Sequence, residues 1–227
     1  MNTKGNITVI GIGKLGLCFS LVLEKNGYNV LGVDIDISYV RGINNKTLLS
    51  TEPLVEEYLI NSKNFVATTD IKRGIDFSNK LFIFVATPSL DDGRYDHQQI
   101  NKVVKQIIKS NNANHSKHII IGCTTMPGYC DTIIKQFEST NYSISYSPEF
   151  IAQGSIITDL SNPDLLLIGE GNQFAGDEIE SVYGSILMNK PQVYRMSCKE
   201  AEITKIALNC FLTTKIAYAN MVGDIAL

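Results

Sequence analysis

The stretch ITVIGIGKLG (7–16) determines the fold that this sequence predicts. A short β-branched run is followed directly by the pattern G-x-G-x-x-G, with Gly11, Gly13 and Gly16 at the three glycine positions, and a helical pattern begins there. The first glycine permits a tight turn, the second lets a pyrophosphate approach the backbone, and the third lets the helix pack close to the strand. The helix N-terminus adds free N–H groups and a positive dipole end. The sequence therefore predicts a phosphate-binding turn formed by Gly11, Ile12, Gly13, Lys14, Leu15 and Gly16.

An acidic residue follows at the expected distance. Asp34 closes the second predicted strand, YNVLGVDID (28–36), about 20 residues after the glycines, where a carboxylate can bind both hydroxyls of a ribose. Residues 35–38 include no Arg that could accept a 2′-phosphate, so the pattern favours NAD over NADP. The alternative is a tight turn between strand and helix that binds no ligand.

The rest of the chain continues the alternation of strands and helices. Strands are predicted at 65–69, 80–87, 118–125, 142–147, 165–169 and 192–196, and helices at 98–110, after Gly128 and at 174–187. Strands that are apolar on both faces are typical of a covered parallel sheet. We therefore expect an α/β fold over residues 1–197, with a Rossmann-like, doubly wound, mostly parallel sheet. An uninterrupted helical pattern over 198–227 indicates the beginning of a second, helical domain.

Composition excludes several classes of function. The chain has 227 residues, 44% of them hydrophobic, and a net charge of −3 with scattered basic residues. This charge distribution argues against nucleic acid or an anionic membrane as a partner. No apolar run reaches the length of a membrane span, and the five cysteines form no CxxC pair. We expect a cytoplasmic protein with buried thiols and no metal site.

Polar residues follow three of the predicted strands. Thr87 lies in ATPSLDDGRYD (86–96), Thr124 and Thr125 lie in CTTMPG (123–128), and Glu149 lies in SPEF (147–150). Ligands of doubly wound sheets bind beyond the carboxyl ends of the strands, so these residues are candidates for a site. Ordinary turn residues and a helix N-cap are the alternative interpretations.

The final helix carries a polar stripe. Lys205, Asn209 and Thr213 are spaced i, i+4 and i+8, so they share one side of the helix. A neighbouring ammonium and amide can stabilise an oxyanion formed in carbonyl chemistry. Periodicity alone favours the alternative, in which the stripe is the solvent face of an amphipathic helix and Glu202 and Lys205 are exposed.

Several motifs together resemble the UDP-glucose/GDP-mannose dehydrogenase family along the whole chain: GIGKLG, Asp34, ATPS, CTTMPG, SPEFIAQGS (147–155), NPDLLLIG (162–169) and EAEITKIALNC (200–210). The resemblance implies an NAD-dependent enzyme that oxidises the C6 alcohol of a nucleotide sugar, such as UDP-glucose, to a uronic acid. The reaction in that family passes through an aldehyde and a cysteine thioester.

The resemblance also implies a role for each candidate residue. The glycine turn, Asp34 and Thr87 would bind NAD, while Thr124 would lie near the nicotinamide and help hold the catalytic water. Glu149 would lie near the reacting C6, where it can act on water or on the substrate hydroxyl. The expected catalytic residues are Thr124, Glu149, Lys205 and Asn209, the expected substrate-binding residues are Glu149, Phe150, Gln153, Lys205 and Asn209, and Gln153 is also expected to contact the cofactor.

Three positions depart from the family pattern. Lys14 replaces an aromatic residue in the glycine turn, and Pro127 directly precedes Gly128 although the family proline stands two residues before the glycine. Gln153 replaces a second glutamate, and an amide can bind a ligand but cannot act as a base.

The family's nucleophilic cysteine follows a central helical region that forms homodimers, and the sequence contains neither its glycine-rich loop nor a second nucleotide-binding domain. We therefore expect the N-terminal portion of such a dehydrogenase, inactive alone, with residues 198–227 forming the start of the dimerisation helix. Cys210 is predicted to be a packed thiol rather than a substitute nucleophile. The exposed apolar side of 203–227 predicts self-association.

Two alternatives remain. A β-hydroxyacid dehydrogenase also joins a Rossmann domain to a helix with Lys and Asn, although SPEFIAQGS and ATPS argue against it. A stand-alone NAD-binding module without catalysis is the other.

Overall fold

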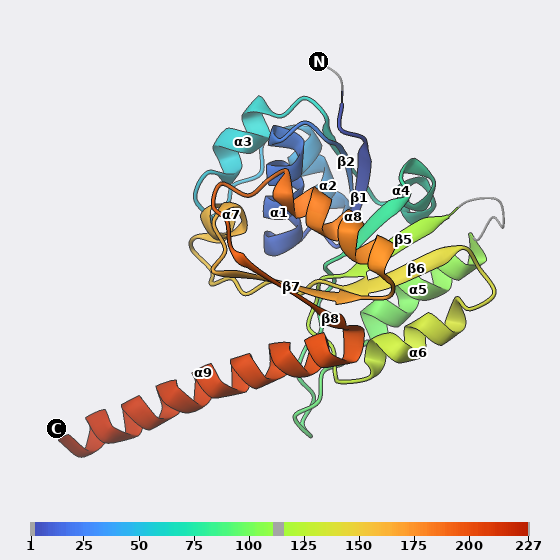
Figure 1. The fold of residues 1–227 in the computed structure, drawn as a ribbon. Coiled ribbons are helices and arrows are strands. Elements are labelled where there is room, and N and C mark those ends of the chain that lie inside the picture. Colours follow the sequence, from blue (N-terminus) through green and yellow to red (C-terminus); the bar gives the residue numbers. More distant parts are fainter. Residues whose placement is uncertain (1–2, 111–115, 227) are drawn as a thin grey trace.

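A computed structural model describes residues 3–110 and 116–226. One eight-stranded sheet has the order β3-β2-β1-β4-β5-β6-β7-β8, in which all neighbours are parallel except the antiparallel pair β6 and β7. Helices lie on both faces of this sheet (Figure 1). The order around β1 is that of a Rossmann fold. The strands β2 and β3 lie on one side of β1 and β4 lies on the other, so the switch point lies between β1 and β4. The predicted α/β class and the mostly parallel, doubly wound sheet are confirmed.

The elements alternate along the chain. The strands are β1 (Asn6–Ile10), β2 (Asn29–Val33), β3 (Phe65–Thr68), β4 (Lys80–Ile83), β5 (Lys117–Ile121), β6 (Tyr142–Tyr146), β7 (Leu165–Glu170) and β8 (Gln192–Ser197). The helices are α1 (Lys14–Lys25), α2 (Ile37–Asn44), α3 (Val55–Asn61), α4 (Ile71–Phe77), α5 (Gln98–Lys109), α6 (Tyr129–Gln136), α7 (Ile156–Ser161), α8 (Gln173–Gly184) and α9 (Cys198–Ala226).

The strands β4 and β5 are shorter than the predicted ranges 80–87 and 118–125. The neighbour of β4, β1, ends at the glycine turn, and the ladder stops soon afterwards: Phe84 still donates its N–H to Ile10, and Gly122, after β5, donates to Ile83. The residues beyond these bonds leave the sheet at its carboxyl edge. The later residues of both predicted strands are therefore loops at this edge rather than parts of the sheet.

Helices α2, α3, α4 and α7, each of eight residues or fewer, are not among the predicted elements. Polar caps fix the first residues of two of them. Asp36 accepts hydrogen bonds from the N–H groups of Ser38 and Tyr39 at the start of α2, and Asp70 accepts one from Arg73 at the start of α4. Such caps satisfy backbone donors that have no partner within the helix.

Two apolar clusters fill the two faces of the sheet. One contains buried side chains of α1, α2, α3, α7 and α8, and the other contains those of α4, α5, α6 and the first turn of α9. A parallel sheet that is covered on both faces needs apolar side chains on both sides of its strands. This explains the continuous apolar runs at β4 and β5, where Leu81 to Ile83 and Ile119 to Ile121 are all buried.

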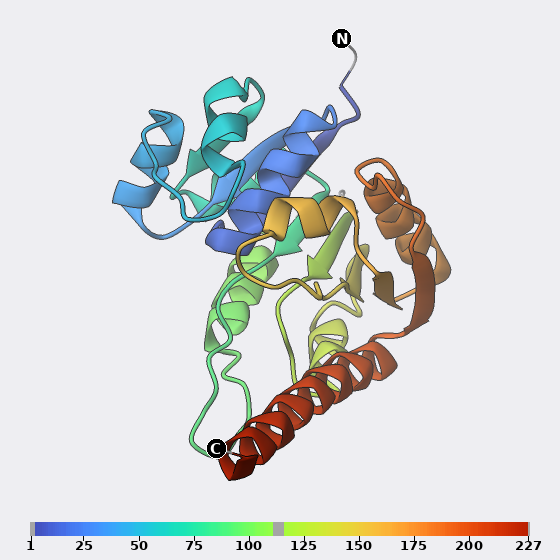
Figure 2. The same cartoon turned by 90° about the vertical axis from the view of Figure 1, so that its left-hand side faces the viewer.

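Helix α9 begins against the sheet and then projects away from it (Figures 1 and 2). Its buried side chains are confined to its first turns, at Cys198, Ala201, Glu202 and Lys205. Within residues 3–110 and 116–226, no helix is long and apolar enough to cross a membrane.

Candidate functional site

The three glycines of the turn between β1 and α1 differ in what an added side chain would meet. Gly11 has a φ of +86°, and a Cβ there would lie 2.7 Å from the carbonyl oxygen of Phe84. A Cβ at Gly16 would lie 2.0 Å from the carbonyl oxygen of Gly11. A Cβ at Gly13 would meet no protein atom within 4 Å. The first and third glycines are therefore required by the fold, whereas the second keeps an open space in front of the turn.

Asp34 lies beside this turn. Its Oδ2 accepts the N–H of Ile12 at 3.2 Å, and its Oδ1 accepts the N–H of Asp36 at 3.1 Å. Each carboxylate oxygen has a further lone pair for a ligand hydroxyl. The side chain of Ile12 is fully buried, so Ile12 can offer only its backbone to the site. The structure thus brings the predicted acid and the predicted turn together.

Two of the residues that depart from the family pattern contact each other. Nζ of Lys14, in the first turn of α1, donates to Oε1 of Gln153 at 3.2 Å. Both side chains are exposed. The loop after β6 is therefore tied to the glycine turn across 139 residues of sequence. Leu15, the next residue after Lys14, packs against the apolar cluster on the α1 face.

The loop around Gln153 has an anchor that the sequence did not reveal. Glu52 is 4% exposed, and its carboxylate accepts the N–H of Gly154 at 2.9 Å. Gly154 has a φ of +99°, a conformation that favours glycine. Because the partners are 102 residues apart, no local pattern indicates this contact.

The predicted residues after β4 and β5 lie at one edge of the sheet. The two strands are parallel neighbours, with Ile83 beside Ile121, so Thr87 and Thr124 follow them on the same side. Both are partly exposed. Thr125 is fully buried, in contrast, and its Oγ1 donates to Glu202 at 2.8 Å.

Glu202 binds three groups of the turn between β5 and α6. Besides the Thr125 hydroxyl, its carboxylate accepts the N–H of Gly128 at 2.6 Å and the N–H of Cys130 at 2.9 Å. Its side chain is fully buried. The interpretation that places Glu202 and Lys205 on the solvent face of the helix is therefore wrong, because Lys205 is also only 7% exposed. The sequence signal was an acid and a base one turn apart in a mostly apolar stretch.

The turn that Glu202 holds contains the shifted proline. Gly128, after the exposed Pro127, has a φ of +85° and is the N-cap of α6. A glycine is needed at this position because other residues rarely adopt such a φ. Its free N–H is the one that Glu202 binds. The turn is thus closed from α9 rather than by its own side chains.

Glu149 and Lys205 meet after β6. Nζ of Lys205 donates to the backbone carbonyl of Glu149 at 2.7 Å and lies 4.3 Å from the ring centroid of Phe150. The carboxyl group of Glu149 accepts a short hydrogen bond from the hydroxyl of Tyr183. Sequence reasoning placed the first three of these residues in the site and missed Tyr183.

Burial governs the charge of this pair. Burial raises the pKa of Glu149 to about 7, and the Tyr183 hydrogen bond and the Lys205 charge lower it in part. Burial also lowers the pKa of Lys205, although the charge of Glu149 partly restores it. A carboxyl group with a pKa near neutrality can give up and take up a proton under ordinary conditions.

The rest of the stripe on α9 is less enclosed. Asn209 is partly exposed one turn after Lys205, and Thr213 is exposed and donates to the backbone of its own helix. The structure therefore brings Lys205 into the site and places Asn209 beside it on the helix. The prediction that Cys210 is a packed thiol is wrong, because it is exposed where α9 has left the sheet. The other four cysteines are buried as predicted.

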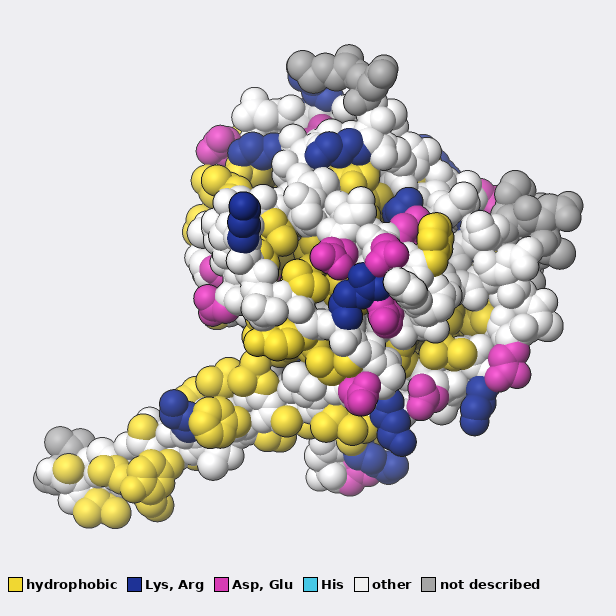
Figure 3. Space-filling model, viewed as in Figure 1, with side chains coloured by type: hydrophobic (Ala, Val, Ile, Leu, Met, Phe, Trp, Pro, Cys, Tyr) yellow, Lys and Arg dark blue, Asp and Glu magenta, His cyan; other side chains and the backbone are white. Residues whose placement is uncertain are grey.

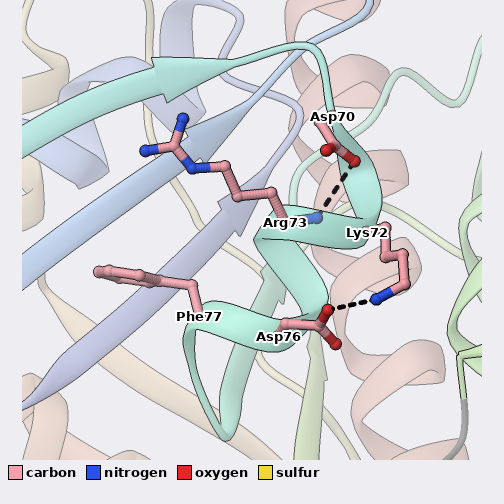
Figure 4. Close-up of a pocket in the computed structure, with 5 residues that line it drawn as sticks. All are labelled: Asp70, Lys72, Arg73, Asp76 and Phe77. Carbon is pink, nitrogen blue, oxygen red and sulfur yellow. Dashed lines mark hydrogen bonds and ion pairs between the residues drawn. The ribbon is translucent and has the colours of Figure 1, made fainter.

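A shallow depression of about 480 Å³ lies elsewhere, along α4. Asp70, Lys72, Arg73, Asp76 and Phe77 line it (Figure 4). Lys72 and Asp76 form an exposed ion pair at 2.6 Å, and Asp70 caps the helix. None of these residues belongs to the predicted site, and Lys72 and Asp76 already pair with each other.

Comparisons with known proteins agree with this geometry. Residues 5–187 match the profile of the UDP-glucose/GDP-mannose dehydrogenase family, NAD binding domain. The chain is 29% identical over 225 residues to the UDP-glucose 6-dehydrogenase of Rickettsia typhi, a match that covers 97% of this chain and 51% of that protein. It is 28% identical over 234 residues to the GDP-mannose 6-dehydrogenase of Pseudomonas syringae pv. tomato, covering 97% and 52%.

A solved structure is similar as well. The UDP-glucose dehydrogenase of the archaeon Pyrobaculum islandicum superposes with a TM-score of 0.88 and 25% identity, covering 98% of this chain and 52% of that one. The chain thus spans about half the length of the relatives that it matches.

Proposed function

The chain belongs to the UDP-glucose/GDP-mannose dehydrogenase family, and from this premise we propose that it is the NAD-binding part of an enzyme that oxidises the C6 alcohol of a nucleotide sugar to a uronic acid. The glycine turn is the observation that carries the proposal. Two of its glycines are required by contacts within the fold, but Gly13 faces open space. A turn of this kind at a helix N-terminus suits a pyrophosphate.

The residues of the turn fit the cofactor. NAD supplies the hydride acceptor for oxidation of the alcohol. The backbone N–H groups of the turn would hold its pyrophosphate, and the free lone pairs of Asp34 would hold a ribose. Lys14 and Gln153 would lie over the same turn, where their hydrogen bond joins the two loops. Thr87 and Thr124 would contact the cofactor beyond the switch point between β1 and β4.

The residues after β6 and on α9 would act on the sugar. Glu149 would take the proton of the C6 hydroxyl or of a water molecule, which its pKa of about 7 permits near neutral pH. Lys205 and Asn209 would stabilise negative charge on the C6 oxygen. Phe150 and Gln153 would contact the substrate from the loop that Lys205 and Glu52 hold in place. Thr124 would help to hold the catalytic water.

The division of the chain is part of the proposal. Residues 1–197 would form the NAD-binding domain and residues 198–227 the start of a helical domain that pairs two copies of the protein. Helix α9 is the protruding arm in Figure 3, and hydrophobic side chains cover much of it. This assignment is supported by the exposed apolar side chains of α9, which are Ile203, Phe211, Leu212, Ile216, Tyr218, Met221, Val222 and Ile225. An apolar surface of this kind on a helix suits burial against a second helix.

The proposed cofactor is tested by calorimetric titration of the purified chain with NAD and, separately, with NADP. We expect saturable binding of NAD and much weaker binding of NADP, because a 2′-phosphate would face the Asp34 carboxylate without an arginine. An Asp34→Ala variant should bind NAD at least tenfold more weakly, and a Glu57→Ala variant, changed at an exposed acid beside the C-terminal end of α1, should bind as the unmodified chain does. Equal binding of NAD and NADP would contradict the proposed role of Asp34.

A further inference from the structure

Tyr183 of α8 places a hydroxyl group in the proposed site. The residue is 2% exposed. Its hydroxyl donates to Oε1 of Glu149, and Ser147 Oγ donates to the Tyr183 oxygen at 3.4 Å. The phenol group is thus the donor that reaches the carboxyl group of Glu149, and it comes from an element that carries no predicted site residue.

Aromatic packing fixes the position of this hydroxyl. The Tyr183 ring lies 5.9 Å from the ring of Phe19 in α1, measured between centroids, and Phe19 in turn lies 4.9 Å from Phe82 and 5.2 Å from Phe84. All four rings are buried. A side chain held in a close-packed interior has few alternative rotamers. The hydroxyl therefore has a fixed place relative to α1, the helix that begins at the glycine turn.

The two carboxyl oxygens of Glu149 differ in their surroundings. Oε1 accepts the Tyr183 hydrogen bond, whereas Oε2 accepts no hydrogen bond from any residue in the described part of the chain. The Glu149 side chain is partly exposed. Lys205 binds the backbone carbonyl of Glu149 rather than its carboxyl group. One oxygen is thus bound to Tyr183, whereas the other has no hydrogen-bond partner among the described residues.

We propose that Tyr183 is a positioning residue for Glu149, which fixes one carboxyl oxygen so that the other faces the reacting C6 group of the bound sugar. The inference rests on the proposed function, in which Glu149 acts at C6. Burial and the nearby Glu149 charge raise the pKa of Tyr183 well above its usual value, so the phenol keeps its proton and remains a donor. Its hydrogen bond favours the ionised form of the carboxyl group, which is the form that accepts a proton.

The test measures the titration of Glu149 in the chain itself, by carbon-13 NMR of labelled glutamate carboxyl groups. A Glu149→Gln variant identifies the signal. The midpoint is expected at about 7 in the unmodified chain. In Tyr183→Phe, which keeps the packed ring, the midpoint should rise by about 1 to 2 pH units, because a hydrogen bond to a charged group is lost. Tyr28→Phe is the matched control, since it removes the hydroxyl of another buried tyrosine, one that accepts from Ser185 at 3.2 Å.

An unchanged midpoint in Tyr183→Phe, or an equal change in Tyr28→Phe, would overturn the inference. A second measurement needs no change at Tyr183: its labelled Cζ signal should follow the Glu149 titration in the unmodified chain and become independent of pH in Glu149→Gln. A Cζ signal that ignores the titration would also overturn it. Failure of the unmodified chain to bind NAD would contradict the proposed function without altering these titrations, so the two failures are distinguishable.

Discussion

The substitution Gly13→Ala should separate cofactor binding from folding. Gly13 is the N-cap of α1 with a φ of −58°, a value that alanine also adopts, and its added Cβ would meet no protein atom within 4 Å. We therefore expect the free energy of unfolding to change by less than about 1 kcal/mol, with a small gain from the less flexible unfolded chain. For a protein of this size, that corresponds to a change in melting temperature of at most about 4 °C.

The effect on NAD should be much larger. The new methyl group occupies the space through which a pyrophosphate would approach the backbone of the turn, so the N–H groups can no longer reach it closely. We expect the dissociation constant for NAD to rise at least about tenfold, a loss of about 1.4 kcal/mol. Calorimetric titration gives the affinity, and urea unfolding of the same sample gives the stability.

Gly16→Ala is the contrasting variant. Its Cβ would lie 2.0 Å from the Gly11 carbonyl oxygen, a backbone atom that cannot move aside alone. We expect a loss of stability of about 1–3 kcal/mol or more. If Gly13→Ala bound NAD like the unmodified chain, the pyrophosphate would not lie on this turn. If Gly13→Ala lost as much stability as Gly16→Ala, the open space at Gly13 would be contradicted.

Three further predictions concern the surrounding structure. Replacing the buried Glu202 by alanine leaves two backbone N–H groups and a hydroxyl without their acceptor, so urea unfolding should show a loss of stability of about 2–4 kcal/mol. The control Glu57→Gln, at an exposed position, should change stability by less than about 0.5 kcal/mol. Equal losses in the two variants would refute the role of Glu202. The hydrogen bond to His118 and the charge of Lys80 lower the pKa of Glu178 from 4.5 to about 2, so the carboxylate's contribution to stability should be complete above pH 4.5 and disappear as the pH falls towards 2. The free energies of unfolding of the unmodified chain and of Glu178→Gln, measured at several pH values, should therefore differ at neutral pH and converge near pH 2. A difference in unfolding free energy that does not depend on pH would contradict this. Light scattering should find a dimer of the chain and a monomer after Phe211→Lys and Tyr218→Lys, because both side chains are exposed on α9, and a strictly monomeric unmodified chain would count against pairing through this helix.

The local patterns of the sequence were sufficient for the fold and for the glycine turn. The roles of Gly11 and Gly16 follow from contacts with Phe84, directly after β4, and with the turn itself, and the glycine pattern specifies such close contacts between a strand and the helix that follows it. Asp34 could be predicted because it directly follows the neighbouring strand β2. The predicted positions of Glu149 and Lys205 also proved to be in contact.

The supporting residues could not be predicted, since their partners are distant in sequence. Glu52 binds Gly154 across 102 residues, Glu202 binds Thr125 across 77, and Tyr183 binds Glu149 across 34. Each is an ordinary residue in its local pattern.

At Cys210 the sequence predicted a buried side chain that the structure shows to be exposed. Its apolar neighbours suggested burial, but α9 leaves the sheet before that position. Apolar periodicity does not say which part of a long helix the fold covers.

A crystal structure of the chain with NAD would test the central claim most directly. We expect the pyrophosphate in front of Gly13 within hydrogen-bond distance of the backbone N–H groups of the turn, a ribose on Asp34, and the nicotinamide at the sheet edge near Thr124 and Glu149. NAD bound elsewhere on the protein, or with its nicotinamide away from these strand ends, would contradict it.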